Sequence, residues 1–177
     1  MVLGLVWSSA AGADQTDPRL DGLFAQLAGN LSPAEARLIE NQIWQIWYGY
    51  EGDNEEIDRW MAMGQVANRS GYLDLAHTFY TQIVEADPNF AEGWNRRATV
   101  NYLLGAHEES LADIDRTLAL EPRHFGALAG QGLVYLALNE PERALAAFEA
   151  ALAVNPHLPG ARANAEALRE SVVGEPI

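Results

Sequence analysis

Residues 91–124 read AEGWNRRATVNYLLGAHEESLADIDRTLALEPRH, and residues 125–158 read FGALAGQGLVYLALNEPERALAAFEAALAVNPHL. Proline stands at the same place in both stretches, at Pro122 and Pro156, and Pro88 lies one equal step earlier. The step is that of a helix–turn–helix unit of about 34 residues, which cannot bury its apolar face alone and stacks on its neighbours. The spacing therefore predicts an all-α protein built from stacked helix pairs.

Other positions keep the same period, and each has a physical role. The first helix of a unit carries a bulky residue and then a small one that lets the second helix approach, and Gly or Asn ends the helix because both tolerate a left-handed backbone. In that order, the residues are Trp60, Trp94 and Leu128; Gly64, Ala98 and Gly132; and Gly71, Gly105 and Asn139. The second helix keeps a small position and a large one, which are Ala76, Ser110 and Ala144, and Tyr80, Ile114 and Phe148.

These agreeing positions resemble the tetratricopeptide repeat (TPR) family, with three repeats at residues 57–90, 91–124 and 125–158. The resemblance implies a right-handed α-solenoid of antiparallel helix pairs. The chain departs from the family pattern at Arg97, where an apolar residue is common. We expect Arg97 to reach Asp113 on the second helix of its repeat in a partly buried ion pair.

Residues 14–56 predict one further, degenerate TPR-like helix pair that covers the first repeat. Its second helix begins at Ser32, with Glu35 three residues later, which is the pattern of a capping box. Trp44, Trp47 and Tyr48 share one face of that helix. We expect this face to pack on the helix at 57–70; the alternative is an aromatic platform for a ligand.

After the last repeat, residues 159–177 predict a capping helix and a tail. Ala161, Ala165 and Leu168 form a narrow apolar stripe on that helix, and the residues between them are mostly polar. A solenoid needs such a helix because its last apolar face is otherwise open to water.

Composition excludes several classes of function. The formal net charge is −14, with 25 acidic and 11 basic residues among 177, which disfavours nucleic acid and anionic membrane surfaces as partners. The chain has no cysteine, so it offers neither a disulfide nor a thiolate site. No apolar stretch is long enough for a membrane span, so we expect no integral membrane insertion.

The first thirteen residues differ from the rest. An apolar stretch, VLGLVW, precedes a run of small residues that ends in Ala11-Gly12-Ala13, which fits the small-x-small rule for signal peptide cleavage. We interpret residues 1–13 as the remnant of a bacterial signal peptide, although no basic residue precedes the apolar stretch. The expected location is the periplasm or the extracellular space, and the alternative is a cytoplasmic protein.

The sequence offers few groups arranged for chemistry. The four histidines, His77, His107, His124 and His157, lack the spacing of a helical zinc site, and we expect them at the surface or in turns. The chain has neither the G-x-S-x-G pattern nor a phosphate-binding glycine loop. We therefore expect no catalytic residue, no metal and no cofactor, and the protein is not expected to be an enzyme. An unrecognised site within 14–56 is the remaining enzymatic alternative.

The TPR resemblance implies a concave groove lined by the first helices. Carried over position by position, the candidate peptide-binding residues are Met61, Gln65, Asn68, Arg69, Asn95, Thr99, Tyr102, Leu133 and Leu136. The amide side chains suit an extended peptide backbone, because an amide both donates and accepts hydrogen bonds. The leucines and the tyrosine suit an apolar side chain of the ligand.

One TPR subclass is set aside. Co-chaperones that hold acidic chaperone tails use basic residues and Asn at groove positions that here carry Met61, Gln65, Asn95, Thr99, Ala129 and Leu133. The expected function is therefore a scaffold that binds another peptide or protein segment, in envelope assembly or maintenance. A purely structural oligomerisation unit is the alternative, and the sequence leaves the oligomeric state open.

Overall fold

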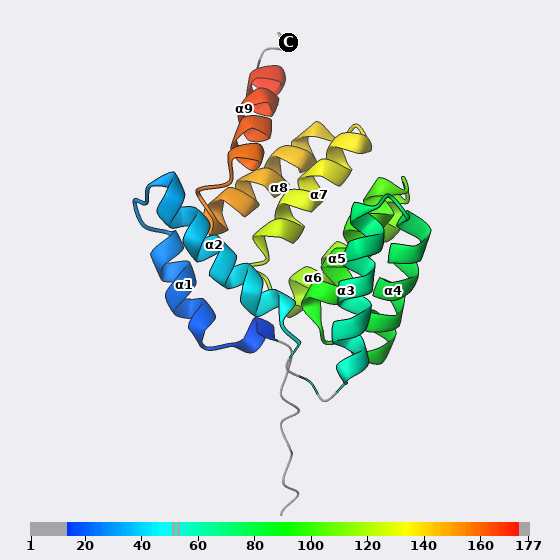
Figure 1. Ribbon diagram of the computed structural model, residues 1–177. Coiled ribbons are helices and arrows are strands. Elements are labelled where there is room, and N and C mark those ends of the chain that lie inside the picture. The colour runs from blue at the N-terminus through cyan, green and yellow to red at the C-terminus, as the bar shows by residue number, and fades with distance from the viewer. Residues whose placement is uncertain (1–13, 51, 53, 174–177) are drawn as a thin grey trace, which may run out of the picture.

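The computed structural model describes residues 14–50, 52 and 54–173, so the segment 1–13, with its expected cleavage site, lies outside the described residues. The described residues contain one short 3-10 helix and nine α-helices and no strand, which confirms the predicted all-α fold (Figure 1). Their bounds are η1 Asp14–Thr16, α1 Arg19–Leu27, α2 Pro33–Tyr48, α3 Glu55–Arg69, α4 Leu73–Ala86, α5 Ala91–Leu103, α6 His107–Leu120, α7 Phe125–Ala137, α8 Pro141–Val154 and α9 Pro159–Val173.

Six of these helices form the three repeats. The pairs α3–α4, α5–α6 and α7–α8 stack in chain order, and α9 packs on α8 (Figure 1). Ala161, Ala165 and Leu168 of α9 are buried in one cluster with Phe148 and Ala151 of α8. The TPR-like solenoid predicted from the sequence period is therefore the observed architecture.

The turn inside each repeat has the predicted left-handed residue. Gly71 and Gly105 both have a φ of 78°, and Asn139 has a φ of 58°. An L side chain is strained there unless it is Asn or Asp, so the third repeat keeps the turn without glycine. The recurrence of this one conformation in every repeat is a direct consequence of the sequence period.

The small position of each first helix faces the large position of the second. A Cβ added at Gly64 would lie 2.6 Å from the ring of Tyr80, and one added at Gly132 would lie 2.6 Å from the ring of Phe148. The missing side chains therefore let the two helices of a repeat approach until a buried ring fills the space between them.

Two glycines of α7 provide a matched stability test. Gly132→Ala is expected to lower the free energy of unfolding by about 1–3 kcal/mol, because the new methyl group overlaps the buried ring of Phe148. Gly130→Ala meets only Ile114, at 3.9 Å, and is expected to stabilise the protein by up to about 1 kcal/mol through helix propensity. Urea denaturation measures both values, and equal effects would contradict the assigned contact.

A second prediction concerning the repeats is also confirmed. Arg97 on α5 binds Asp113 on α6 through two hydrogen bonds, Nε to Oδ2 at 2.9 Å and Nη2 to Oδ1 at 2.7 Å. Asn101 donates to the same carboxylate at 3.0 Å. A bidentate pair with a third donor satisfies the buried Asp113, which explains why a charged residue is tolerated at this position.

The N-terminal hairpin, α1 and α2, begins its second helix as predicted. Ser32 accepts a hydrogen bond from the backbone of Glu35, and the Glu35 carboxylate accepts one from the backbone of Ser32, which completes the capping box. Two of the backbone amides at the helix start, those of Ser32 and Glu35, are thereby satisfied.

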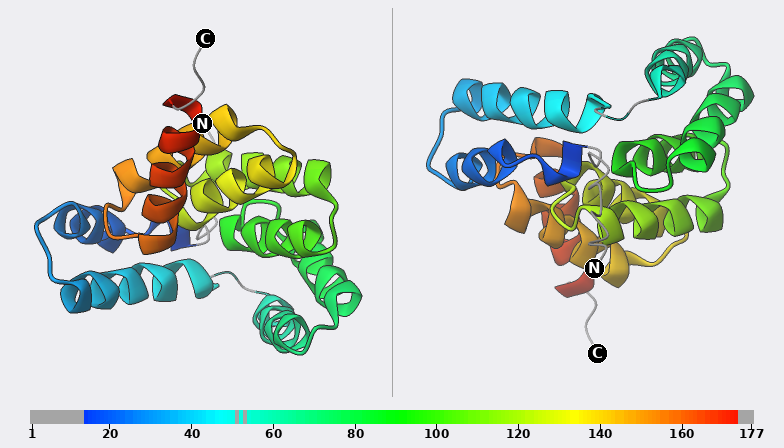
Figure 2. Two further views of the ribbon diagram at one scale, coloured as in Figure 1. Left: turned by 90° about the horizontal axis from the view of Figure 1, so that it is seen from above. Right: turned by 90° about the horizontal axis from the view of Figure 1, so that it is seen from below.

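The expected packing of this hairpin on the first repeat is wrong. Trp47 is buried in one cluster with Phe125 of α7, and the cluster also contacts Val154 and Leu158 at the end of the third repeat. Both views of Figure 2 place α1 and α2 beside α7 and α8, away from α4. The aromatic face of α2 therefore packs on the third repeat, far along the chain, and not on the adjacent helix α3.

Candidate functional site

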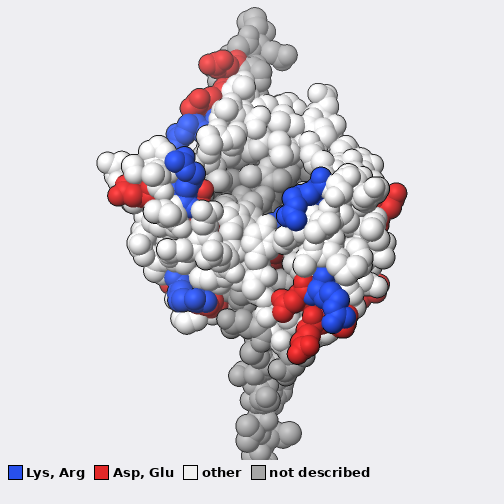
Figure 3. All heavy atoms as spheres, viewed as in Figure 1, with Lys and Arg blue, Asp and Glu red and all other residues white. Residues whose placement is uncertain are grey.

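The inner face of the second and third repeats contains a pocket of about 220 Å³ between α5, α6 and α7. Its floor is apolar, and polar groups of α5 stand along one side. The lining residues are Asn95, Ala98, Thr99, Tyr102, Ser110, Ile114, Gly126, Ala127, Ala129, Gly130, Leu133 and Val134. In the space-filling view of Figure 3, the molecule is hollowed near its centre and most of the surface around the hollow is uncharged.

Four of the predicted groove residues meet in this pocket. Asn95, Thr99 and Tyr102 come from successive turns of α5, and Leu133 comes from α7 and is 38% exposed. The spacing of three and four residues puts the α5 side chains on one helix face. The pocket thus combines polar groups and an exposed leucine, as the groove positions of the sequence predict.

The other five predicted residues lie elsewhere. Met61 is 5% exposed and belongs to the core of the first repeat, because it packs with Ile57 and Tyr80; its assignment to the groove is corrected. Leu136 is half-buried and packs in the core of the third repeat. The remaining three lie on α3 outside the pocket, and these are Gln65, Asn68 and Arg69.

Asn95 has less freedom than a solvated amide. It is 6% exposed, and its Nδ2 donates a hydrogen bond of 2.9 Å to Oε2 of Glu92 one turn earlier. This bond orients the amide so that Oδ1 remains available as an acceptor. Thr99 donates to the backbone carbonyl of Asn95 at 3.0 Å, so its hydroxyl oxygen can also accept.

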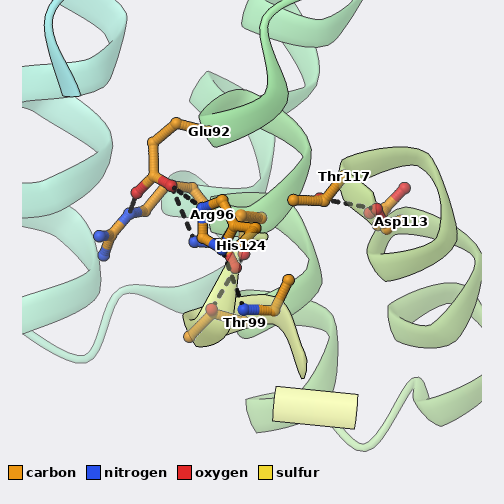
Figure 4. Close-up of polar contacts among 8 residues, drawn as sticks. Glu92, Arg96, Thr99, Asp113, Thr117 and His124 are labelled. Atoms are coloured by element: carbon orange, nitrogen blue, oxygen red, sulfur yellow. Dashed lines mark hydrogen bonds and ion pairs between the residues drawn. The ribbon is translucent and has the colours of Figure 1, made fainter. Parts of the chain in front are cut away.

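Behind the pocket lies a buried polar cluster that the sequence analysis missed, formed by Glu92, Asn95, Arg96 and His124 (Figure 4). Glu92 is 1% exposed, and its carboxylate accepts hydrogen bonds from Nδ2 of Asn95 and Nε of Arg96. Nε2 of His124 lies 3.0 Å from Oε2 of the same carboxylate. Burial raises the pKa of Glu92 above its ordinary value, and the hydrogen bonds from His124 and Asn95 oppose that shift.

His124 connects three helices. Its Nδ1 accepts a hydrogen bond of 3.0 Å from the backbone of Ala127 and so caps the start of α7. Nε2 must then carry the proton, which it donates to Glu92 of α5. The ring of Trp47 on α2 stacks on the imidazole, with centroids 4.1 Å apart and an interplanar angle of 11°. His124 lies in a turn between repeats, as expected, and it is fully buried there.

The arginines near the pocket are already paired. Arg96 binds Glu92 and lies over the rings of Tyr48 and Trp44, and burial lowers the pKa of its guanidinium to about 10. Arg97 is held by Asp113. A pocket whose neighbouring cations are neutralised in this way is a weak site for a ligand carboxylate.

The N-terminal hairpin contacts one residue of the pocket lining, Gly126. A Cβ added at Gly126 would lie 2.6 Å from the ring of Trp44, so this glycine lets the indole of α2 cover the start of α7. The predicted aromatic face of α2 therefore packs on the start of α7, next to the pocket.

Two other kinds of site are absent from the part of the chain that the structure describes. There, no group of three or more His, Asp or Glu side chains is placed to hold a metal ion. Among the helices of the same residues, none has the length and apolar character needed to cross a bilayer.

Comparisons of sequence identify relatives of the chain. Two sequence models described as tetratricopeptide repeat match residues 61–125 and 125–158. A TPR repeat-containing protein of Rhizobium etli is 33% identical over 156 residues, which are 88% of this chain and 76% of the relative. The SGT1 homolog of Oryza sativa is 36% identical over 77 residues, and the match spans 44% of this chain and 21% of that protein.

Solved structures share the fold. The first TPR of Spaghetti (RPAP3), bound to the HSP90 peptide SRMEEVD, has a TM-score of 0.65 at 22% identity and covers 71% of this chain and 99% of its own. The Sgt2 TPR domain from Aspergillus fumigatus has a TM-score of 0.65 at 20% identity and covers 70% of this chain and 87% of its own. Repeat period, helix pairing and these relatives agree that the chain belongs to the tetratricopeptide repeat family.

Proposed function

We propose that this protein is a protein–protein interaction module that binds a peptide or protein segment in the pocket between α5 and α7. The observation that carries the proposal is the juxtaposition in one open pocket of acceptors on α5 with an exposed leucine on α7. Oδ1 of Asn95 accepts from a backbone N–H of the ligand. Leu133 and the ring of Tyr102 contact an apolar side chain of the ligand.

The ligand is an apolar segment and not an acidic tail. The related structures of RPAP3 hold the peptides SRMEEVD and SGPTIEEVD, which are rich in carboxylates. In the present chain Arg96 and Arg97 are bound to Glu92 and Asp113, and the net charge of −14 repels an acidic peptide. The pocket therefore suits a neutral or basic segment with one buried aliphatic or aromatic residue.

The binding test uses a peptide selected from a random displayed library against the purified protein. Leu133→Asn is expected to weaken binding of that peptide by roughly tenfold or more, since burying one leucine is worth about 1.5–3 kcal/mol. Fluorescence anisotropy of the labelled peptide measures the dissociation constant. The peptide SRMEEVD serves as an acidic comparison and is expected to bind more weakly.

The matched control is Leu38→Asn, because Leu38 is 64% exposed on α2 and does not line the pocket. This variant should bind the selected peptide as the unmodified protein does. An equal loss in both variants, or no loss in Leu133→Asn, would place the ligand outside the pocket. Preferred binding of the acidic peptide would overturn the proposed ligand class.

We also propose that the module acts without catalysis, as a scaffold in the bacterial envelope. The lack of convergent titratable groups in the described pocket supports the first part, because Asn95, Thr99 and Tyr102 are its main polar side chains. The small-residue ending of the segment 1–13 supports the second part.

Export makes a separate prediction. In the source organism the mature protein should begin at Asp14 and should be recovered from the periplasmic or secreted fraction. Mass spectrometry of its N-terminal peptide after cell fractionation checks both statements. Protein that retains residues 1–13 and is recovered from the cytoplasm would contradict the location and leave the binding proposal unaffected.

A further inference from the structure

The outer side of the first repeat carries an exposed apolar surface, here called the first-repeat face. It is formed by Met63 and Val66 of α3 and by Tyr72, Leu75 and Phe79 at and along α4. Met63 is 45% exposed, Val66 55%, Tyr72 67% and Leu75 47%. Eight large hydrophobic residues are exposed within the described part of the chain, and half of them lie on this one face. Such clustering marks an interaction surface.

The equivalent positions of the three repeats show which kind of contact buries this face. Val66, Val100 and Val134 occupy the same position of successive repeats. Val100 is fully buried in one cluster with Tyr80 of α4, and Val134 is 1% exposed in one cluster with Ile114 of α6. In the second and third repeats the preceding repeat covers this position. At Val66 the same side chain is exposed, because α1 and α2 pack on the third repeat.

Among the surfaces that a second copy of the chain offers, its own first-repeat face complements this apolar surface best. The outer side of α9 is polar, with exposed Arg162, Glu166 and Arg169, so it does not complement an apolar surface. On α1 and α2, Leu38 is the single large hydrophobic residue among those exposed. Head-to-tail stacking of copies is therefore disfavoured, and a closed two-fold pairing is favoured.

The charges beside the face are self-complementary. Arg69 follows Val66 by three residues on α3, and Asp74 precedes Leu75 at the start of α4. Both are exposed, and neither forms an ion pair with another residue that the structure describes. If two copies pair through this face about a two-fold axis, Arg69 of one copy comes toward Asp74 of the other. The wider surface is acidic and opposes association, so salt should strengthen the pairing.

Three observations agree: the equivalent valines are covered in the other repeats, the exposed apolar residues gather on this one face, and charges of opposite sign lie beside it. We infer that the first-repeat face is the interface of a two-fold symmetric homodimer. None of its residues lines the pocket between α5 and α7. Dimerisation therefore leaves both peptide pockets open, and the dimer presents two of them. A ligand with two copies of the recognised segment gains affinity from this arrangement through effective concentration.

Analytical ultracentrifugation of the full chain tests the inference. The unmodified protein should shift from monomer to dimer as its concentration rises through the micromolar range, and more readily in about 500 mM than in about 50 mM NaCl. Val66→Glu should raise the dimer dissociation constant by at least about tenfold, because it places a charge in the apolar centre. Leu75→Glu, on the other helix of the face, should do the same.

Leu38→Glu is the matched control, since Leu38 is an exposed hydrophobic residue of α2 outside the first-repeat face, and this variant should dimerise as the unmodified protein does. Circular dichroism should show native helix content in all three variants, because each site is exposed. A monomer at every concentration and salt level would overturn the inference, and would leave the face to a different protein. A dimer that Val66→Glu and Leu75→Glu do not weaken would overturn it as well.

Discussion

Glu92→Ala is expected to lower the free energy of unfolding by about 3–5 kcal/mol, which is the cost of breaking a buried ion pair by removing one partner. Glu92 is 1% exposed, and its carboxylate accepts hydrogen bonds from Asn95, Arg96 and His124. The alanine variant leaves the guanidinium and the imidazole without their acceptor in a site that water does not reach freely. Urea denaturation followed by circular dichroism measures the loss.

Two further variants separate this effect from a general loss of acidic residues. Glu109→Ala removes an exposed carboxylate from α6 and should change the free energy of unfolding by no more than about 0.5 kcal/mol. The double variant Glu92→Ala/Arg96→Met should cost less than the sum of the two single variants, because neither partner is then left alone. Strict additivity would mean that the pair contributes little to stability.

Trp47→Ala is expected to cost a similar amount, about 3–5 kcal/mol, because it opens a cavity between the hairpin and the third repeat. The ring is 1% exposed, stacks on His124 and lies 5.0 Å from the ring of Phe125, measured between centroids. Amide exchange should speed up first in α1 and α2, while α3 and α4 keep their protection.

Trp47→Phe is the control for the size of the ring. The indole Nε1 is buried and has no hydrogen-bond partner among the described residues, so its removal sacrifices no bond. The phenyl ring retains most of the stacking on His124, and the cost should stay below about 1.5 kcal/mol. A phenylalanine variant as unstable as the alanine variant would show that a phenyl ring does not fill the space of the indole, and would contradict the expected retention of the stacking on His124.

The repeats could be predicted from the sequence because their contacts are local and recur. Gly64 and Tyr80, and likewise Gly132 and Phe148, are partners with the same separation in sequence, so the repeat period specifies both contacts. The left-handed turn residues and the pair of Arg97 with Asp113 follow in the same way. Each is a property of one repeat, and repeats resemble one another.

The docking of the hairpin has no such signal. Trp47 meets His124 across 77 positions of sequence, and neither residue belongs to a repeated pattern that pairs them. The same limit explains the errors in the candidate site. Met61 has the register of a groove residue, but its side chain packs in the first-repeat core. Asn95 has the correct position, yet its amide is oriented by a glutamate whose burial no local pattern predicts.

The docked hairpin also changes how this solenoid is expected to fold. In an open array each repeat touches only its neighbours, so unfolding can proceed from either end in steps. Here Nε2 of His157, at the end of the third repeat, lies 3.1 Å from the carbonyl oxygen of Leu27, which is 130 positions away in the sequence. Asn155 donates a hydrogen bond to Glu40, 115 positions away. These contacts connect the N-terminal hairpin to the third repeat, so the two ends of the array are in direct contact. They raise the contact order, which slows folding. If one end of the array unfolds, the other end also loses the contacts between them, so we expect the molecule to unfold in a single cooperative transition.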